Sequence, residues 1–131
     1  MKYLEDQIVK ELLQDQWHKV IETIEEAFID PTADMVPKTY LKAGNVGDYR
    51  AMPAALGGYA ALKWIGVFPN NQEIDPILGS GIPLPTTLGT LILSDRYRGQ
   101  TLMAMDCTTL TAYRTAATSA IAAKYCAPDA K

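Results

Sequence analysis

Metal-ligating side chains are scarce in this 131-residue sequence, which has one histidine and two cysteines. His18 lies among polar residues, and we expect it to be an ordinary surface side chain. Cys107 and Cys126 are too far apart on one predicted helix to form a disulfide with each other, and we expect both to be buried free thiols. Because there is no Cys-x-x-Cys pair either, the sequence predicts no metal site.

The sequence also lacks a long apolar run. Residues 107–123 carry one charge, Arg114, but they are too few and too rich in Thr and Ser to cross a bilayer, which takes about 20 mostly apolar residues. The N-terminus, MKYLEDQIVKELL, mixes acids with apolar residues and does not resemble a secretory signal. We therefore expect a cytoplasmic protein with no membrane partner. Its 48% hydrophobic and 21% charged residues indicate a single globular domain over residues 1–131.

A basic excess is missing as well, since the formal net charge is -3. This charge gives no general attraction to nucleic acid. It is also uneven: residues 1–34 hold nine acids and three lysines, whereas residues 35–131 hold six acids and nine lysines and arginines. The excess of cations in the second part favours a small anionic ligand over a polyanion.

Apolar spacing predicts helices at the start of the chain. In DQWHKVIETIEEAFID the apolar residues recur every three or four positions, and LEDQIVKELL has similar spacing. The first 30 residues are therefore expected to form two helices, with a break near Gln14 and an end at Pro31. A last helix is expected from residues 107–109, where a threonine can cap it, to about Ala127.

Between these helices the pattern changes to short runs separated by turn residues, which is typical of strands. The expected strands are residues 39–42, 49–52, 60–68, 87–94 and 101–106. Gly99 suits a hairpin loop that needs positive φ. The order predicts an α+β fold with N-terminal helices, a mostly antiparallel mixed sheet and a long C-terminal helix.

Residues 69–85 hold four of the eight prolines and predict a long loop, a kind of segment that is often functional. Its glycine-rich part, GSGIPL at 79–84, fails as a dinucleotide-binding fingerprint. Leu84 stands where the third glycine or alanine belongs, and prolines prevent a helix from opening there.

Three cations stand among apolar residues. Lys63 lies in AALKWIGVF, where a strand would be apolar on both faces and therefore buried. Arg114 is the single charge between Asp106 and Lys124 in the last predicted helix, and Arg50 follows a turn in GDYRAMP. One interpretation is that each cation pairs with an internal acid. The available acids are Asp48, Asp95 and Asp106.

The other interpretation is that Arg50, Lys63 and Arg114 converge on a pocket for a carboxylate or phosphate. Arginine offers a bidentate fork to such a ligand, and lysine offers a point charge. A partly buried Lys63 would have a lowered pKa, which suits proton transfer near neutral pH. The residue types leave both interpretations open.

Several motifs occur together in a specific order. They are G-x-x-R-x-M-P at 47–53, K-x-x-x-x-x-P-x-N at 63–71, Pro-Thr at 85–86 and T-A-x-R-T-A-A at 111–117. With them, the chain resembles the ornithine cyclodeaminase and mu-crystallin family nearly throughout residues 1–131. Members of that family are NAD(P)-dependent enzymes that act on amino acids or their imines, including ornithine cyclodeaminases, archaeal-type alanine dehydrogenases and ketimine reductases.

The resemblance implies a substrate pocket. Arg50, Lys63 and Arg114 would hold the α-carboxylate of an amino-acid or imino-acid substrate, and Lys38 would lie at the pocket edge. Lys63 would be the catalytic proton shuttle.

The resemblance also implies cofactor contacts. Thr86 and Thr115 would face the phosphates of NAD or NADP, and Arg114 would lie between substrate and dinucleotide. Gly66 and Phe68 stand where many members carry Asn and His, which leaves the identity of the substrate open.

In the family, the first half is a substrate-binding and dimerisation domain and the second half is a Rossmann domain. The sequence ends at APDAK, where the Rossmann domain would begin. We therefore expect a homodimeric substrate-binding domain that has no cofactor and no turnover alone, as a fragment or as one half of a split enzyme completed by a separate dinucleotide-binding chain. The alternative is a catalytically inactive, standalone dimeric module for amino-acid binding or assembly.

Overall fold

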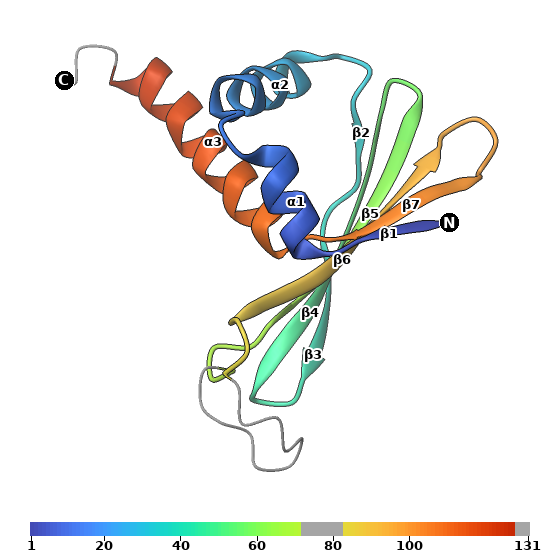
Figure 1. The fold of residues 1–131 in the computed structure, drawn as a ribbon, viewed down its shortest axis with the longest axis vertical. Coiled ribbons are helices and arrows are strands. Elements are labelled where there is room, and N and C mark those ends of the chain that lie inside the picture. The colour runs from blue at the N-terminus through green and yellow to red at the C-terminus, as the bar shows by residue number, and fades with distance from the viewer. Residues whose placement is uncertain (72–82, 128–131) are drawn as a thin grey trace.

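The computed structural model describes residues 1–71 and 83–127, and within these ranges it contains three helices and one seven-stranded sheet (Figure 1). The strands are β1 (Lys2–Leu4), β2 (Asp34–Met35), β3 (Thr39–Ala43), β4 (Gly47–Leu56), β5 (Tyr59–Val67), β6 (Thr87–Asp95) and β7 (Thr101–Asp106). The helices are α1 (Asp6–Leu13), α2 (Trp17–Ile29) and α3 (Thr108–Cys126). The predicted α+β class is confirmed.

The sheet has the order β1-β7-β6-β5-β4-β2, and β3 also pairs with β4. Its neighbours are antiparallel apart from β1 and β7, which run parallel. On one edge of β4, β3 pairs with residues 47–51 and β2 with residues 54–55. Pro53, which has no N–H to donate, lies in the gap between these two partners. This gap explains why β4 continues through the proline to Leu56, beyond its predicted end.

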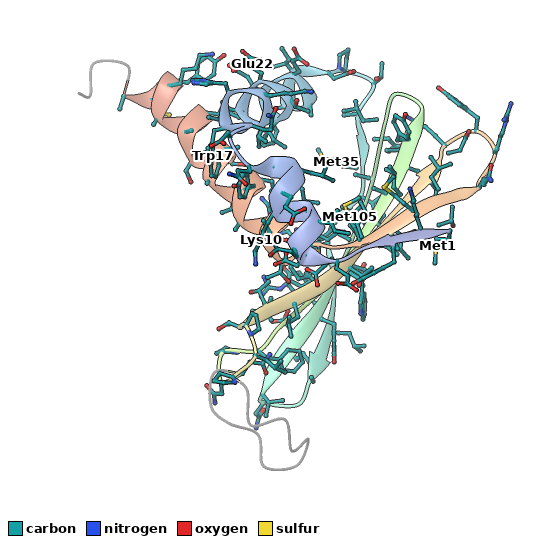
Figure 2. The ribbon with its side chains drawn as sticks, in the orientation of Figure 1. Met1, Lys10, Trp17, Glu22, Met35 and Met105 are labelled. Carbon is teal, nitrogen blue, oxygen red and sulfur yellow. The ribbon has the colours of Figure 1, made fainter. Side chains whose placement is uncertain are left out.

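The three helices group together on one side of the sheet (Figure 1). Most of the buried side chains lie where α1 and α3 meet this face. Val9, Ile65, Ala104, Cys107, Thr109 and Ala117 are at most 9% exposed, and of these Ala104 pairs with Tyr3 and Ile92 in the sheet. Trp17 at the start of α2 lies beside α3 (Figure 2). Its ring stacks on Tyr113 of that helix, with ring centroids 4.1 Å apart. Near the other end of α3, Lys124 Nζ donates to both carboxylate oxygens of Glu25 in α2.

Two short strands depart from the prediction. Residues 2–4 were expected to be helical, but they form β1, which pairs with Met103–Met105 of β7. The helical expectation was wrong there because pairing with a distant strand overrides local spacing. β2, a two-residue strand, was not predicted. By contrast, Gly99 has φ of 68° in the β6–β7 hairpin, as predicted.

The cysteines also differ from each other. Cys107 is fully buried, as expected, but the prediction for Cys126 was wrong because that thiol is exposed. The last turn of α3 extends away from the sheet (Figure 1), and the described residues leave this thiol exposed. His18 is exposed, as predicted. No helix in the described ranges is long and apolar enough to cross a membrane. Most of the predicted 69–85 loop, with its glycine-rich stretch, falls outside these ranges.

Carboxylates, rather than the predicted threonine, cap the start of α3. Thr108 N donates to Asp106 Oδ1 at 2.8 Å, and Thr109 N donates to Asp6 Oδ1 at 3.0 Å. Asp6 lies at the start of α1 and also pairs with Lys10 at 2.8 Å. Acceptors at a helix N-terminus satisfy amides that have no partner within the helix. Asp6 therefore ties the first helix to the last.

Asp6→Ala is expected to lower the free energy of unfolding by about 1 kcal/mol at pH 7, the usual cost of losing a cap. Burial acts to raise the pKa of Asp6, but hydrogen bonds from Lys10 and Thr109 outweigh it and lower the pKa overall. The contribution of Asp6 to the free energy of unfolding is therefore fully present above the ordinary carboxyl pKa of about 4. It is lost as the pH falls through the lowered pKa that Asp6 has in the folded protein. Urea unfolding at pH 7 and in acid checks both points. Glu26→Gln, at an exposed acid in α2, is the control, and an equal effect of the two changes would contradict the cap.

Candidate functional site

Lys63 lies in the middle of β5, on the sheet face that the helices cover. Its partners across the sheet are Met52 of β4 and Leu91 of β6. The side chain is half-buried, and it has no acid partner among the described residues. Burial lowers the pKa of Lys63, and the positive charges of Arg114 and Lys38 lower it further. A lysine in this environment can exchange a proton more readily than a surface lysine.

Arg114 projects from α3 near Lys63. Its side chain is exposed. It also borders an apolar hollow of about 340 Å³ between α1, α2 and α3. Lys38 is exposed immediately before β3 and adds to the positive potential at Lys63. The fold thus brings Lys38, Lys63 and Arg114 together, and no ion pair within the described ranges involves any of them.

Arg50 behaves differently. Strand register places it on the same sheet face as Lys63, because Arg50 is opposite Ile65 and Met52 is opposite Lys63. Its guanidinium, however, is engaged by Asp48, with Nε 2.6 Å from Oδ1 and Nη2 3.2 Å from Oδ2. The ion-pair interpretation is therefore confirmed for Arg50.

The other two acids considered as ion-pair partners, Asp95 and Asp106, accept hydrogen bonds from backbone amides instead. Asp95 accepts from the amides of Tyr97 and Arg98 in the hairpin, and Asp106 accepts from Thr108. Neither forms an ion pair with Lys63 or Arg114 in the described part of the chain. These two cations are left to attract an external anion.

Thr86 and Thr115 border a second, open hollow of about 570 Å³ beside α3. Other hydroxyls and the small residues Ala112 and Ala116 complete its wall. The Thr115 hydroxyl donates to Thr111 O at 2.7 Å, so it would have to rotate to donate to a ligand. Hydroxyls beside small residues suit the close approach of a phosphate. The two threonines that the resemblance assigns to the cofactor phosphates therefore border one hollow.

Sequence reasoning missed the role of Gly89 and Cys107 in shaping this region. The Cys107 thiol is buried against Gly89, where an added Cβ would lie 2.9 Å from Sγ. Burial raises the pKa of this thiol, and the charge of Lys63 acts in the opposite direction. The two residues are eighteen positions apart and meet because the register of β6 and β7, which pairs Thr90 with Asp106, brings Cys107 opposite Gly89, where the Cys107 N–H donates to Gly89 O at 3.0 Å.

The opposite face of the sheet is open. Trp64 is 40% exposed and stacks on Tyr49, with ring centroids 5.3 Å apart. The expectation that β5 is buried on both faces was therefore wrong for this outer face. Strand register places further exposed apolar side chains on this face. They are Tyr3, Leu41 and Ile92.

Comparison with known proteins agrees with the motifs, since the model of the ornithine cyclodeaminase/mu-crystallin family matches residues 3–131. The chain belongs to this family. An alanine dehydrogenase of Archaeoglobus fulgidus is 41% identical over 112 residues, which are 83% of this chain and 32% of the relative. The resemblance predicted from the motifs is confirmed.

Solved structures of the family share the fold. An archaeal alanine dehydrogenase dimer with bound NAD superposes with a TM-score of 0.77 at 38% identity, over 95% of this chain and 37% of the other. The Δ1-pyrroline-2-carboxylate reductase of Thermococcus litoralis, in complex with NADH and L-proline, gives 0.76 at 28% identity, over 95% and 38%. The chain thus spans about a third of the length of these relatives.

Proposed function

We propose that this chain is the substrate-binding domain of an NAD(P)-dependent amino-acid oxidoreductase of the ornithine cyclodeaminase type. The observation that carries the proposal is the group formed by Lys38, Lys63 and Arg114, three cations with no acid paired to them in the described ranges. Clustered cations of this kind repel one another, and Lys63 also loses hydration by burial; a bound carboxylate offsets both effects. Relatives that act on alanine, pyrroline-2-carboxylate and ornithine support the choice of an amino-acid or imino-acid carboxylate.

In this proposal the substrate α-carboxylate lies between Lys63 and Arg114, with Arg50 and Lys38 at the margin. An arginine orients the carboxylate because two of its N–H groups can donate to the two carboxylate oxygens, and Lys63 adds positive charge. The lowered pKa of Lys63 lets it take or return a proton at the substrate nitrogen. A bound nicotinamide would accept or return the hydride at the substrate Cα. Thr86 and Thr115 would hold its phosphates, and the residues of this chain would orient the Cα–H bond.

Titration of the purified 131-residue chain with pyruvate, followed by NMR, tests the carboxylate site. We expect saturable shifts centred on Lys63 and Arg114. Pyruvamide, which has the same size but no negative charge, should give no saturable shifts, because the cations bind the negative carboxylate. Equal shifts with both compounds would refute the site.

The same proposal expects no turnover from this chain alone, because NAD or NADP would be held largely by residues outside it, in the same polypeptide or in a partner chain. NAD-dependent oxidation of alanine or ornithine by the purified chain would contradict this. The alternative, an inactive dimeric module for amino-acid binding or assembly, is distinguished by adding a dinucleotide-binding domain from a relative: activity would then appear only if the chain is a working half.

The exposed outer face of the sheet supports a homodimer. Trp64 and Ile92 lie on it, and one structural relative is described as a dimer. Large exposed aromatic side chains are common anchors of interfaces. Trp64→Lys is expected to weaken dimerisation at least tenfold, as measured by light scattering on a gel-filtration column. Tyr97→Lys, in the hairpin at 81% exposure, should leave the mass unchanged. A dimer that survives Trp64→Lys would require another interface.

A further inference from the structure

The pair formed by Asp48 and Arg50 on β4 has a defined geometry. The two residues are two positions apart, so their side chains leave the same face of the sheet. Arg50 donates through Nε to Asp48 Oδ1 at 2.6 Å and through Nη2 to Oδ2 at 3.2 Å. This grip uses the side of the guanidinium that carries Nε. Of its five N–H donors, the two on Nη1 and one on Nη2 remain, and they form the fork at its end.

The neighbouring strands hold the same pair. Tyr40 is opposite Arg50 on β3, and its ring centroid lies 5.4 Å from the guanidinium carbon. Ile65, opposite Arg50 on β5, is 2% exposed. Lys42 is opposite Asp48, yet in the described ranges Asp48 forms an ion pair with Arg50 only. The carboxylate is therefore committed to Arg50.

The position of Arg50 relative to the proposed carboxylate site is also set by register. Because Met52 is opposite Lys63, Arg50 and Lys63 are diagonal neighbours on one face of β4 and β5. Side chains in that relation are roughly 7–8 Å apart at their origins, within reach of a long arginine. A carboxylate on Lys63 and Arg114 would thus lie on the same sheet face as Arg50.

We infer that Asp48 is a positioning residue: by gripping the Nε side of Arg50, it fixes the guanidinium and leaves its end-on fork for the carboxylate of the substrate. The inference rests on the proposed function. An arginine without such a partner would sample many rotamers, and the ligand would have to offset the entropy of ordering it. A partner that fixes a ligand-binding side chain typically changes affinity about 10- to 100-fold, as is known for metal sites.

Asp48→Asn is the test, because asparagine keeps the shape and one acceptor oxygen but cannot accept from both nitrogens of Arg50. We expect the Kd for pyruvate to rise about tenfold. Simple Coulomb attraction predicts the opposite, since removal of a negative charge near the site would strengthen anion binding. If Asp48→Asn binds pyruvate as tightly as the parent does, the inference is overturned. If the variant binds pyruvate more tightly, the inference is also overturned, because Asp48 would then compete with the substrate for Arg50.

A second readout needs no ligand. In the parent chain, the Arg50 Nε–H resonance should be sharp and slow to exchange, and in Asp48→Asn it should broaden. A rapidly exchanging Nε–H in the parent would overturn the inference whatever pyruvate does.

Asp34→Asn is the matched control, because Asp34 pairs with Arg96 at 3.7 Å on a different part of the sheet. It should change neither the Kd nor the Arg50 resonance. Failure of the parent to bind pyruvate would count against the proposed site itself. A parent that binds while Asp48→Asn is unchanged would count only against the role of Asp48.

Discussion

Arg114→Met is expected to weaken pyruvate binding by about 10- to 100-fold, because a hydrogen bond between charged groups contributes roughly 1.5–3 kcal/mol. The midpoint of thermal unfolding should stay unchanged or rise. Arg114 is exposed and has no acid partner in the described ranges, so its removal breaks no internal ion pair and relieves repulsion of Lys63. NMR titration and calorimetry on the same sample measure both quantities.

Arg98→Met provides the comparison, since Arg98 is exposed in the β6–β7 hairpin, away from the three cations. It should leave both quantities unchanged. A large loss of stability in Arg114→Met with binding retained would mean that Arg114 serves an internal contact rather than a ligand. Loss of binding in both variants would indicate a response to net charge instead of a site.

Gly89→Ala should be the most destabilising single methyl addition in the sheet. A Cβ there would lie 2.4 Å from Trp64 O and 2.9 Å from both Cys107 Sγ and the Cα of Ile65. Two of these atoms belong to the backbone of β5 and cannot move without disturbing the pairing of β5 with β6. Overpacking a core commonly costs 1–3 kcal/mol, and we expect about 3 kcal/mol here.

Urea unfolding measures this loss, and the unfolding midpoint should fall by roughly 10 °C. Gly58→Ala is the matched control, because its Cβ would meet nothing within 4 Å and its φ is not positive. Adding Cys107→Ala to Gly89→Ala should restore only part of the loss, since the carbonyl of Trp64 remains. A Gly89→Ala protein within 0.5 kcal/mol of the parent would mean that β6 can shift away from β5, against the register described here.

The features that sequence reasoning predicted are those that depend on neighbouring residues. Turn residues predicted where the strands end, and the spacing of apolar residues predicted α2. Both patterns can be read from a few neighbouring residues. Lys63 and Arg114 could be singled out because a charge among apolar residues is costly wherever it lies. The family motifs added which ligand such charges would serve.

The features that were missed depend on contacts between distant residues. Asp6 caps Thr109 across 103 positions, and β1 is a strand because β7 is there to pair with it. The open face at Trp64 could not be inferred from β5 alone, since apolar alternation does not say on which side helices will pack. Asp48 was a candidate partner for three cations, and the residue types alone did not show that it pairs with Arg50, two positions away on β4.

The parallel pairing of β1 with β7 has a consequence for how the chain folds. Residues 2–4 are made first, but they can dock only after residues 103–105 have joined the sheet. A contact over such a sequence separation carries a large loop-closure cost, and folds that depend on such contacts are slow. During synthesis, β1 therefore pairs only after the rest of the sheet has formed. Until β1 pairs with β7, the edge of β7 is exposed and can pair with other chains. Asp6 follows this strand directly, so the cap on the helix that carries Arg114 is among the last contacts to close.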